Sequence, residues 1–336
     1  MALLFIDSFD HYQNPDVNNK WTDGFIIPGL GGLGTGRCGT NSLQMGTFNG
    51  VNKGLVFGSL RAIVGHAFSI LPVTVGSVPV GAYVGNSVAA HVRLYQDLDG
   101  SLVARNANSG VELCRSAPGL VHYEEWYFLE QDITVGATGS ITVRLNNIEI
   151  MAASGVNTLN GDATLRMVGF SCSSNQGYRI DDLYVLDSTG PAPLNAFLGD
   201  CHVEYLRPRA AGPLQQWTSV GSTAHWVVVD DNATPDGDTS HLSSNVPGQV
   251  DTELYQPTGL PSGPIFGLQV SPYAKKTEIG PRVLAPVVNG IQGVAFAPSY
   301  QDYAYFTRPY GTDPATGLPW TIATVNAVSA GVTVVS

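Results

Sequence analysis

Residues 125–150 read EWYFLEQDITVGATGSITVRLNNIEI. The segments 126–135 and 141–150 alternate in polarity and are rich in β-branched and aromatic residues, and the short connection 136–140 carries two glycines. Such residues favour strands, and a short glycine-bearing connection between two such runs is typical of an antiparallel hairpin. The stretch therefore predicts two paired strands, and it indicates a fold rather than an active site.

The rest of the chain repeats this pattern. Segments 89–96 and 101–105 flank Asp99-Gly100, which predicts a second hairpin. Helical periodicity is almost absent, and 39 glycines and 21 prolines are spread among short apolar runs, which favours an all-β fold with many turns. Further strands are expected at 3–9, 24–27, 42–45, 54–57, 62–70, 165–172 and 178–186.

The length of 336 residues suits two domains, and one very long sandwich is the alternative. Turn formers and prolines are concentrated at 187–193, so we place a boundary near residue 190. Residues 1–190 are expected to form a two-sheet jelly roll whose core holds Phe5, Phe9, Val92, Leu94, Trp126, Phe128, Val143, Leu145, Phe170, Ile180 and Leu183.

Residues 191–336 are expected to form a second, less regular β-rich domain. Its core candidates are Trp217, Trp226 and the run 227–229. Strands are expected at 265–273, 280–288 and 304–307, and 322–328 forms either a short helix or a strand.

The charge pattern excludes several partners. The net charge is −11, and Lys275-Lys276 are the only adjacent basic residues, so we expect no nucleic-acid partner. The apolar start 1–6 lacks a basic region and is followed by Asp7, which predicts a first strand and not a signal peptide. No apolar run is long enough to span a bilayer, so membrane insertion is not expected.

The four cysteines, Cys38, Cys114, Cys172 and Cys201, have no C-x-x-C spacing. We interpret them as reduced, mostly buried thiols of a protein made in a cytosol, with pairing of Cys172 and Cys201 as the alternative.

Two acidic segments are the candidates for metal binding. Asp181-Asp182 follows Ile180 on a strand edge and suits either acid/base chemistry or Ca²⁺, or a strand end at which one Asp accepts backbone or arginine hydrogen bonds, which is our interpretation. The loop 230–238 carries Asp230, Asp231, Asp236 and Asp238 but lacks EF-hand spacing, so we interpret it as a solvated loop and leave a metal there open. Residues 97–100 are interpreted as a turn.

No catalytic motif is present. Glycan hydrolysis needs two facing carboxylates, and the available ones are Glu124, Glu125, Glu130, Asp132, Asp181 and Asp182. Glu130 and Asp132 share a strand face, which we interpret as the polar side of the strand. The seven histidines are scattered, and the glycine-rich run 29–36 is interpreted as a surface loop. We therefore expect no enzyme, no catalytic residue, no cofactor and no metal ligand.

Several motifs together resemble a known family. They are residues 7–10 (DSFD), 36–45 (GRCGTNSLQM), the hairpin at Trp126 and 180–185 (IDDLYV). This set resembles the concanavalin-like, laminin-G-like sandwich of tailed-bacteriophage structural proteins, and residues 197–200, 216–218 and 313–321 are similar to the module that follows it there. The resemblance implies a virion component, and it carries no catalytic residues to transfer.

Two functions are expected from this resemblance. The first is a structural part of a phage particle, a capsid decoration or a tail, collar or fibre subunit, assembled in the host cytoplasm through contacts with other virion proteins and with itself, for example as a trimer. The alternative is a carbohydrate-binding module for host attachment, in which exposed aromatics stack on sugars; the candidates are Tyr83, Tyr123, Tyr300, Tyr303 and Tyr305. The sequence leaves open the place in the particle, the oligomeric state and the glycan.

Overall fold

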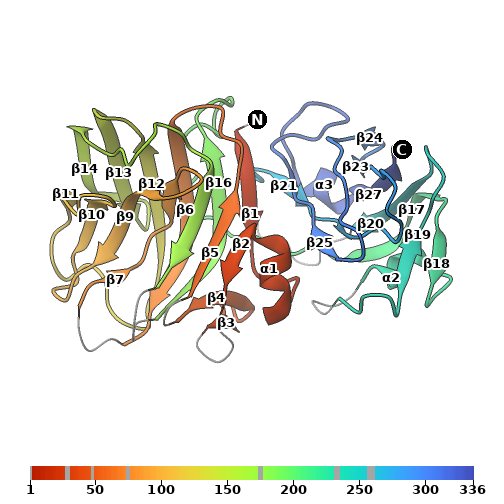
Figure 1. The fold of residues 1–336 in the computed structure, drawn as a ribbon, viewed down its shortest axis with the longest axis horizontal. Helices are drawn as coiled ribbons and strands as arrows, with labels where there is room; N and C mark the ends of the chain where they lie inside the picture. Colours follow the sequence, from red (N-terminus) through yellow and green to blue (C-terminus); the bar gives the residue numbers. More distant parts are fainter. Residues whose placement is uncertain are drawn as a thin grey trace. The chain divides into compact units, whose positions relative to one another are not determined.

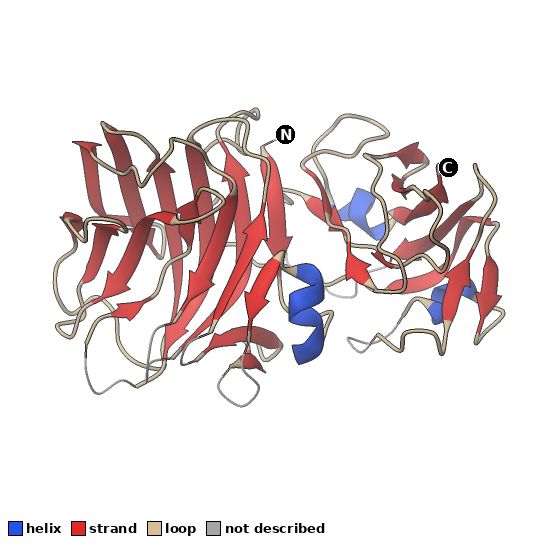
Figure 2. Cartoon of the chain, in the orientation of Figure 1, coloured by secondary structure: helices blue, strands red, loops and turns tan. Residues whose placement is uncertain are grey.

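The computed structural model describes residues 2–26, 31–46, 49–72, 76–172, 177–230, 235–255 and 262–336, without the side chains of 23–25. Strands dominate both parts of the chain, and the three α-helices have four or five residues each (Figure 2). The chain forms two compact units: the first holds residues 2–10 and 14–203, and the second holds 11–13 and 204–336. No helix of the described residues has the length and apolar character needed to cross a membrane.

The first unit is an antiparallel sandwich of two sheets (Figure 1). Sheet A has the order β14 (Ile148–Val156), β13 (Gly139–Leu145), β12 (Trp126–Thr134), β6 (Arg61–Ile70), β16 (Tyr178–Asp187), β4 (Asn41–Met45) and β3 (Gly32–Thr35), and β1 (Leu3–Asp7) also pairs with β16. Sheet B has the order β11 (Glu112–Arg115), β10 (Leu102–Asn106), β9 (Ala90–Gln96), β8 (Tyr83–Gly85), β15 (Met167–Ser171), β5 (Gly50–Gly54) and β2 (Asp23–Phe25), and β7 (Val78–Pro79) pairs with β9.

This architecture confirms the predicted all-β jelly roll. Of the residues expected in its core, all are buried except Trp126, which is half-buried. Residues such as Leu94 and Phe170 are fully buried, and each side chain of this size contributes about 1.5–3 kcal/mol when it leaves water. The apolar residues of strands that alternate in polarity therefore form the core, and no single motif determines it.

The Trp126 hairpin is present, but its second strand is shorter than predicted. β12 pairs with β13 through Leu129–Leu145 and Ile133–Ile141. The chain then reverses at Asn146-Asn147, whose φ angles of 48° and 70° are both in the left-handed region. A two-residue turn with positive φ at both positions is a hairpin turn that asparagine tolerates. Residues 148–156 therefore form a separate edge strand, β14.

A buried ion pair lies at the N-terminal end of the sandwich. The Lys20 ammonium at the end of α1 (Val17–Lys20) lies 2.8 Å from a carboxylate oxygen of Asp7, and both side chains are fully buried. Asp7 also accepts hydrogen bonds from the indole of Trp21 and the backbone N–H of Phe9. The 3₁₀ turn η1 (Asn14–Asp16) leads into α1. The carboxylate thus ties β1 to the helix that follows it.

The segment 191–203, which we had assigned to the second domain, packs on the outer face of sheet A. The backbone N–H of Gly199 donates to Glu130 at 2.8 Å, and that of Val203 donates to Asp182 at 2.8 Å. The compact units divide between Val203 and Glu204. The segment belongs to the first unit because its backbone N–H groups donate hydrogen bonds to buried carboxylates of sheet A.

The second unit is β-rich and less regular, as predicted. Its main sheet has the order β17 (Pro208–Gln215), β20 (Val250–Tyr255), β27 (Ser329–Val334), β23 (Leu284–Val288) and β24 (Ile291–Gln292). Three two-stranded ribbons accompany it: β18 (Thr218–Val220) with β19 (His241–Ser243), β21 (Leu268–Val270) with β26 (Arg308–Tyr310), and β22 (Tyr273–Ala274) with β25 (Ala304–Tyr305).

The structure shows the conformation of two segments of this unit and of the glycine-rich run of the first unit. Residues 227–229 lie in and after helix α2 (His225–Val228), and of the three valines only Val228 is buried. The segment 322–328 contains helix α3 (Ile322–Asn326), which begins with a capping box between Thr321 and Thr324. In the first unit, part of the predicted glycine-rich loop is strand β3, whereas 29–30 lie outside the described residues.

Candidate functional site

The outer face of sheet B carries a row of aromatic and basic side chains. Val84, Val92, Leu94 and Ala104 are fully buried and face the core. Because neighbours along a strand point to opposite faces, the outer face receives Tyr83 of β8, Arg93 and Tyr95 of β9, and Arg105 of β10. Asn52 of β5 pairs with Gly169 of β15, which pairs with Tyr83, so this register continues the row across the sheet.

Arg93 and Tyr83 form the centre of this row. The guanidinium carbon of Arg93 lies 4.6 Å from the centroid of the Tyr83 ring, and one guanidinium nitrogen donates to the Ser171 hydroxyl at 2.5 Å. The Tyr83 ring lies against Gly169, where an added Cβ would meet the ring carbon Cζ at 2.5 Å. Glycine at 169 therefore makes the slot in which the ring lies on the sheet.

A charge network continues the row toward the sheet edge. Arg105 stacks on Tyr95 at 5.2 Å, and Asp97 accepts from Arg105 at 3.3 Å and from Arg115 at 2.8 Å. Although burial raises the pKa of Asp97, the hydrogen bonds from Ser77 and Arg115 hold this pKa below its usual value. Arg115 also pairs with Glu112 at 2.8 Å.

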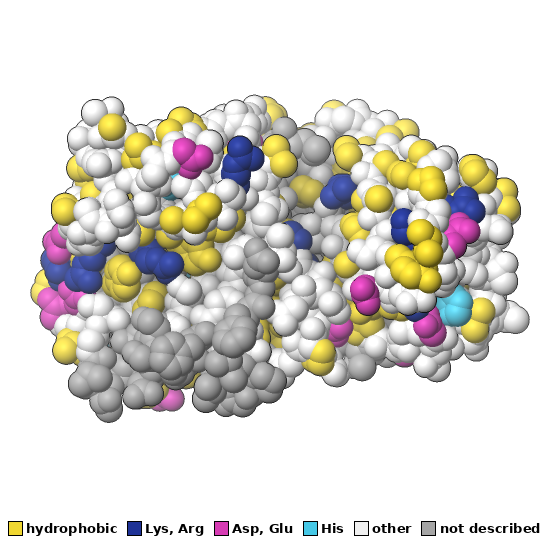
Figure 3. Space-filling view, viewed as in Figure 1, with side chains coloured by type: hydrophobic (Ala, Val, Ile, Leu, Met, Phe, Trp, Pro, Cys, Tyr) yellow, Lys and Arg dark blue, Asp and Glu magenta, His cyan; other side chains and the backbone are white. Residues whose placement is uncertain are grey.

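Arg93 differs from these two arginines, because no carboxylate lies within ion-pair distance of it among the described residues. Figure 3 shows basic, acidic and hydrophobic side chains gathered on this face of the first unit. Of the row, only Tyr83 was a candidate from sequence. The signal that was available for Arg93 is its position between Val92 and Leu94, which places it on the opposite face of β9 from these apolar residues.

The predicted carboxylate pair lies in β16 at a bulge. Asp181 accepts the backbone N–H of Arg37 at 2.8 Å and that of Asp182 at 2.8 Å, which confirms that one Asp accepts backbone hydrogen bonds. Burial, with the charge of Asp182, raises the pKa of Asp181 to about 7. Asp182 has a φ of 52° and lies 2.8 Å from Nδ1 of His202. The pair therefore joins the 36–41 turn and the 197–203 segment to the sheet.

Glu130 and Asp132 share a face of β12, as expected, but Glu130 is not exposed. It is fully buried and accepts the Tyr184 hydroxyl at 2.5 Å. Asp132 forms a bidentate ion pair with Arg61, with a closest distance of 2.5 Å. The interpretation of Glu130 as part of a solvated polar side is wrong, because residues 197–203 cover it.

The acidic loop of the second unit is partly described. Asp236 accepts from Ser240 at 2.9 Å, and Asp238 accepts from Lys275 at 2.6 Å and from Tyr303 at 3.0 Å. Asp231 lies outside the described residues. These partners tie the C-terminal end of the loop to β-structure around Lys275.

The tyrosines expected to be exposed divide into two groups. Tyr83 and Tyr305 are buried, whereas Tyr123 and Tyr300 are exposed. Tyr303 is half-buried and stacks on Tyr273 at 4.9 Å. Exposure was wrong for Tyr83 and Tyr305, because sequence alone does not show which side of a strand is covered.

The four cysteines are thiols and form no disulfide, as predicted, but only Cys172 is buried; Cys114 and Cys201 are half-buried and Cys38 is exposed. Burial raises the pKa of Cys114 and Cys172 to about 11 and that of Cys201 to about 12. A nucleophilic cysteine needs a lowered thiol pKa, so these three thiols are poor nucleophiles at neutral pH.

Comparison with known proteins gives a likeness in fold. No family model matches the chain, and no curated protein matches it. Among solved structures, the endo-β-1,4-glucuronan lyase of Trichoderma reesei is 14% identical, with a TM-score of 0.39, over 52% of this chain and 94% of that one. The cellulose-induced protein Cip1 is 13% identical, with a TM-score of 0.40, over 54% and 96%. Alginate lyase Aly36B is 8% identical, with a TM-score of 0.37, over 55% and 96%.

These matches correct the expectation that the protein is not an enzyme. Two of the three structures are polysaccharide lyases, so a β-sandwich of this kind does not exclude catalysis. The exclusion was wrong because it was drawn from the fold and from the absence of known motifs. The likeness assigns neither a reaction nor a catalytic residue to this chain.

Proposed function

We propose that the first unit binds an acidic glycan on the outer face of sheet B. The observation that carries this proposal is the guanidinium of Arg93, which is stacked on Tyr83, half-exposed, and without a carboxylate partner among the described residues. An arginine in this state has its planar fork available for a ligand carboxylate.

The surrounding row suits a sugar chain. Tyr83 is buried beneath Arg93, so a sugar can contact the guanidinium groups of the row and the half-buried ring of Tyr95. Asn52, Tyr83, Arg93 and Arg105 lie on strands of one sheet from β5 to β10, and four strand spacings give a row about 19 Å long. That length accommodates several sugar residues of an extended chain.

Charge favours an acidic chain over a neutral one at this place. The whole protein carries −11, so it repels polyanions at long range. Within the row, Arg105 and Arg115 are offset by Asp97 and Glu112, and Arg93 remains as the excess positive charge. Binding therefore depends on Arg93 and weakens with salt.

The test uses calorimetry with oligoglucuronate and alginate oligosaccharides, with cello-oligosaccharides of equal length as the neutral comparison. Arg93→Ala is expected to reduce affinity for the acidic oligosaccharides at least tenfold, with Arg93→Lys intermediate. Arg209→Ala, at an exposed arginine of the second unit, is the control and is expected to change nothing. Equal affinity of Arg93→Ala and the unmodified protein would refute the site.

The same samples are also read for the ultraviolet absorbance of an unsaturated uronate. An increase with time would extend the proposal from binding to cleavage, and its loss in Arg93→Ala would place the reaction on this face. A constant absorbance together with measurable affinity supports binding alone.

A second proposal is that the protein is a subunit of a tailed-phage particle, located in the virion and associated with other virion proteins and with itself. The resemblance of its motifs supports this role, and so does strand β14. This strand ends sheet A, exposes 67% of Ile148, and has Glu149 as its single charged residue. A long edge with few charges is a surface that natural proteins avoid unless it pairs.

The occupant we propose for this edge is a second copy of the chain, paired antiparallel through β14. Sedimentation of the purified protein is expected to show an oligomer that Ala152→Pro dissociates, because proline removes a backbone hydrogen-bond donor from β14 and disfavours strand pairing. A monomer at all concentrations would refute the pairing. Absence of the protein from purified particles by mass spectrometry would refute the virion role.

A further inference from the structure

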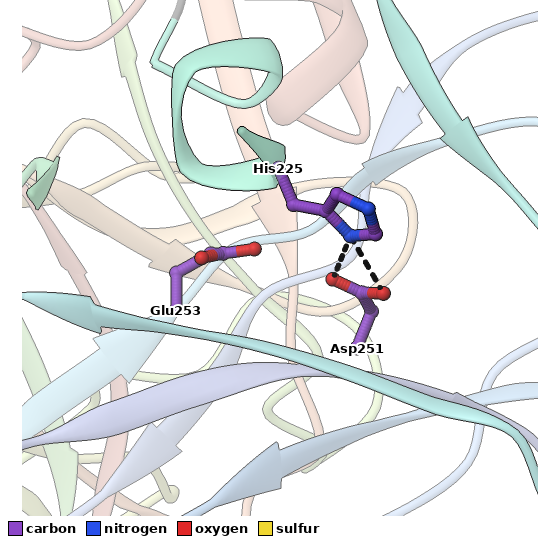
Figure 4. Close-up of side chains that lie close together, drawn as sticks. All are labelled: His225, Asp251 and Glu253. Atoms are coloured by element: carbon purple, nitrogen blue, oxygen red, sulfur yellow. Dashed lines mark hydrogen bonds and ion pairs between the residues drawn. The ribbon is translucent and has the colours of Figure 1, made fainter. Parts of the chain in front are cut away.

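The second unit contains a compact group of three side chains that can bind a metal ion. Asp251 and Glu253 lie two residues apart on β20 and therefore on one face of the strand, and His225 comes from helix α2. One ligand atom from each lies within 4.8 Å of the others. Figure 4 shows the two carboxylates and the imidazole converging on one space.

Burial destabilises the charged carboxylates of this group unless a cation binds to them. Asp251 is 2% exposed and Glu253 is 3% exposed, and β20 lies between β17 and β27 within the sheet. Two carboxylates this close repel one another, and desolvation destabilises their charged forms.

The hydrogen bonds fix two of the ligands and leave one oxygen without a partner. Asp251 accepts the backbone N–H of Trp217 at 2.8 Å, and His225 Nδ1 lies 3.0 Å from both of its carboxylate oxygens. Glu253 accepts from the Gln215 amide at 3.2 Å through Oε1. Its other oxygen, Oε2, is buried and has no hydrogen-bond partner in the structure. Glu130 Oε2 and Asp182 Oδ2 in the first unit are also buried without a hydrogen-bond partner, so such an oxygen alone does not indicate an ion; at Glu253, two further metal-ligating side chains lie within 4.8 Å.

We propose that His225, Asp251 and Glu253 bind a divalent first-row transition-metal ion. The ligands are Nδ1 of His225, one oxygen of Asp251 and the unpartnered Oε2 of Glu253. Metal–ligand bonds of about 2.0–2.2 Å place adjacent ligands about 3 Å apart, and the His225–Asp251 pair already has this separation. The ligand atom of Glu253 lies within 4.8 Å of the other two.

The ligand set and its surroundings select the class of ion. An imidazole with two carboxylates suits Zn²⁺ or Mn²⁺, whereas Ca²⁺ prefers six to eight oxygens. Gln215 donates to Glu253 and the Trp217 backbone donates to Asp251, so both carboxylates have supporting hydrogen bonds of the kind that orient metal ligands. His225 also lines an open depression with Ser219, Gly221, Ser222 and Thr223, which gives an ion and its water ligands a path from solvent.

The experiment uses the full chain, stripped of metal with a chelator and titrated by calorimetry with Zn²⁺, Mn²⁺ and Ca²⁺ separately. We expect one Zn²⁺ or Mn²⁺ per chain, a higher melting temperature with the ion, and weaker binding of Ca²⁺. Glu253→Gln keeps the side-chain shape and is expected to weaken Zn²⁺ binding at least tenfold. The matched control is Glu278→Gln, an exposed glutamate of the same unit paired with Arg282, which should bind as the unmodified protein does.

A spectroscopic measurement on the unmodified protein keeps the proposal testable if a variant does not fold. Electron spin-echo spectra of bound Cu²⁺ should show coupling to one imidazole nitrogen, and this coupling should disappear in His225→Gln. Absence of Zn²⁺ and Mn²⁺ binding, unchanged binding in Glu253→Gln, or a Cu²⁺ spectrum without an imidazole would each overturn the proposal. Because the glycan row lies in the first unit, these outcomes do not depend on the glycan experiments.

Discussion

His66 makes the first unit sensitive to acid. Its imidazole is fully buried on β6 and contacts the Phe170 ring edge-on at 5.1 Å. Nδ1 lies 3.2 Å from the carbonyl oxygen of Ala67, and Nε2 has no hydrogen-bond partner in the structure. Burial lowers the pKa of His66 to about 4, because the charged imidazolium would lose its hydration without gaining a counter-ion.

The consequence is a loss of stability between pH 6.5 and about 4. In this window the unfolded chain protonates His66, whose ordinary pKa is 6.5, while the folded chain keeps it neutral. The unfolded state then binds more protons, so the free energy of unfolding falls as the pH falls. A difference of about 2.5 pKa units corresponds to about 3 kcal/mol, complete below pH 4 and absent above pH 6.5.

The measurement compares the unmodified protein with His66→Leu, which cannot titrate, and with His122→Gln, at an exposed histidine of the same unit. Urea unfolding is followed by pulse proteolysis and mass spectrometry of first-unit peptides, so that the second unit does not contribute. His66→Leu should lose about 3 kcal/mol less than the unmodified protein on acidification, and His122→Gln should follow the unmodified protein. An NMR titration that shows the folded His66 imidazole protonating near pH 6.5 would refute the reasoning.

Three further substitutions test other parts of the structure. Lys20→Met removes the counter-ion of the buried Asp7 carboxylate and should cost about 3–5 kcal/mol in urea unfolding; the double substitution with Asp7→Leu should restore only part of this, because it also removes the acceptor of the Trp21 indole and of the Phe9 N–H. Gly169→Ala should displace the Tyr83 ring and weaken acidic-glycan binding in calorimetry, and unchanged affinity would contradict the stacking geometry. Thr321→Ala removes the capping box of α3 and should lower the free energy of unfolding of the second unit by about 1 kcal/mol.

The sandwich could be predicted because its strands alternate strongly. In β9 and β13, apolar residues recur at every second position, and the structure buries these positions against the opposite sheet. The boundary between β13 and β14 was missed although Asn146-Asn147 is a turn-forming pair, because Ile148 and Ile150 continue an apolar pattern past it. Local pattern therefore located the strands better than their ends.

The glycan row could be predicted only in part. Tyr83 was chosen for its residue type, whereas Arg93 and Arg105 looked like ordinary solvent-facing charges of their strands. What distinguishes Arg93 from Arg105 is that no carboxylate of the described residues lies within ion-pair distance of it, whereas Asp97 pairs with Arg105. This difference depends on the pairing of β9 with β10 and β8, which no local pattern contains.

The proposed metal ligands could not be predicted from the sequence either, because their local pattern indicates an exposed face that the structure buries. Asp251 and Glu253 alternate with Val250, Thr252 and Leu254, which is the pattern of a strand with one polar face toward water. That face is buried because α2 contacts β17 and β20, and α2 contains Val227 and Val228, two of the residues named as core candidates. A charge without a carboxylate partner that stays partly exposed, such as Arg93, can hold a large ligand at the surface. An unpaired oxygen that is buried, such as Oε2 of Glu253, is accessible only to a proton or a small ion, so burial separates the two kinds of site.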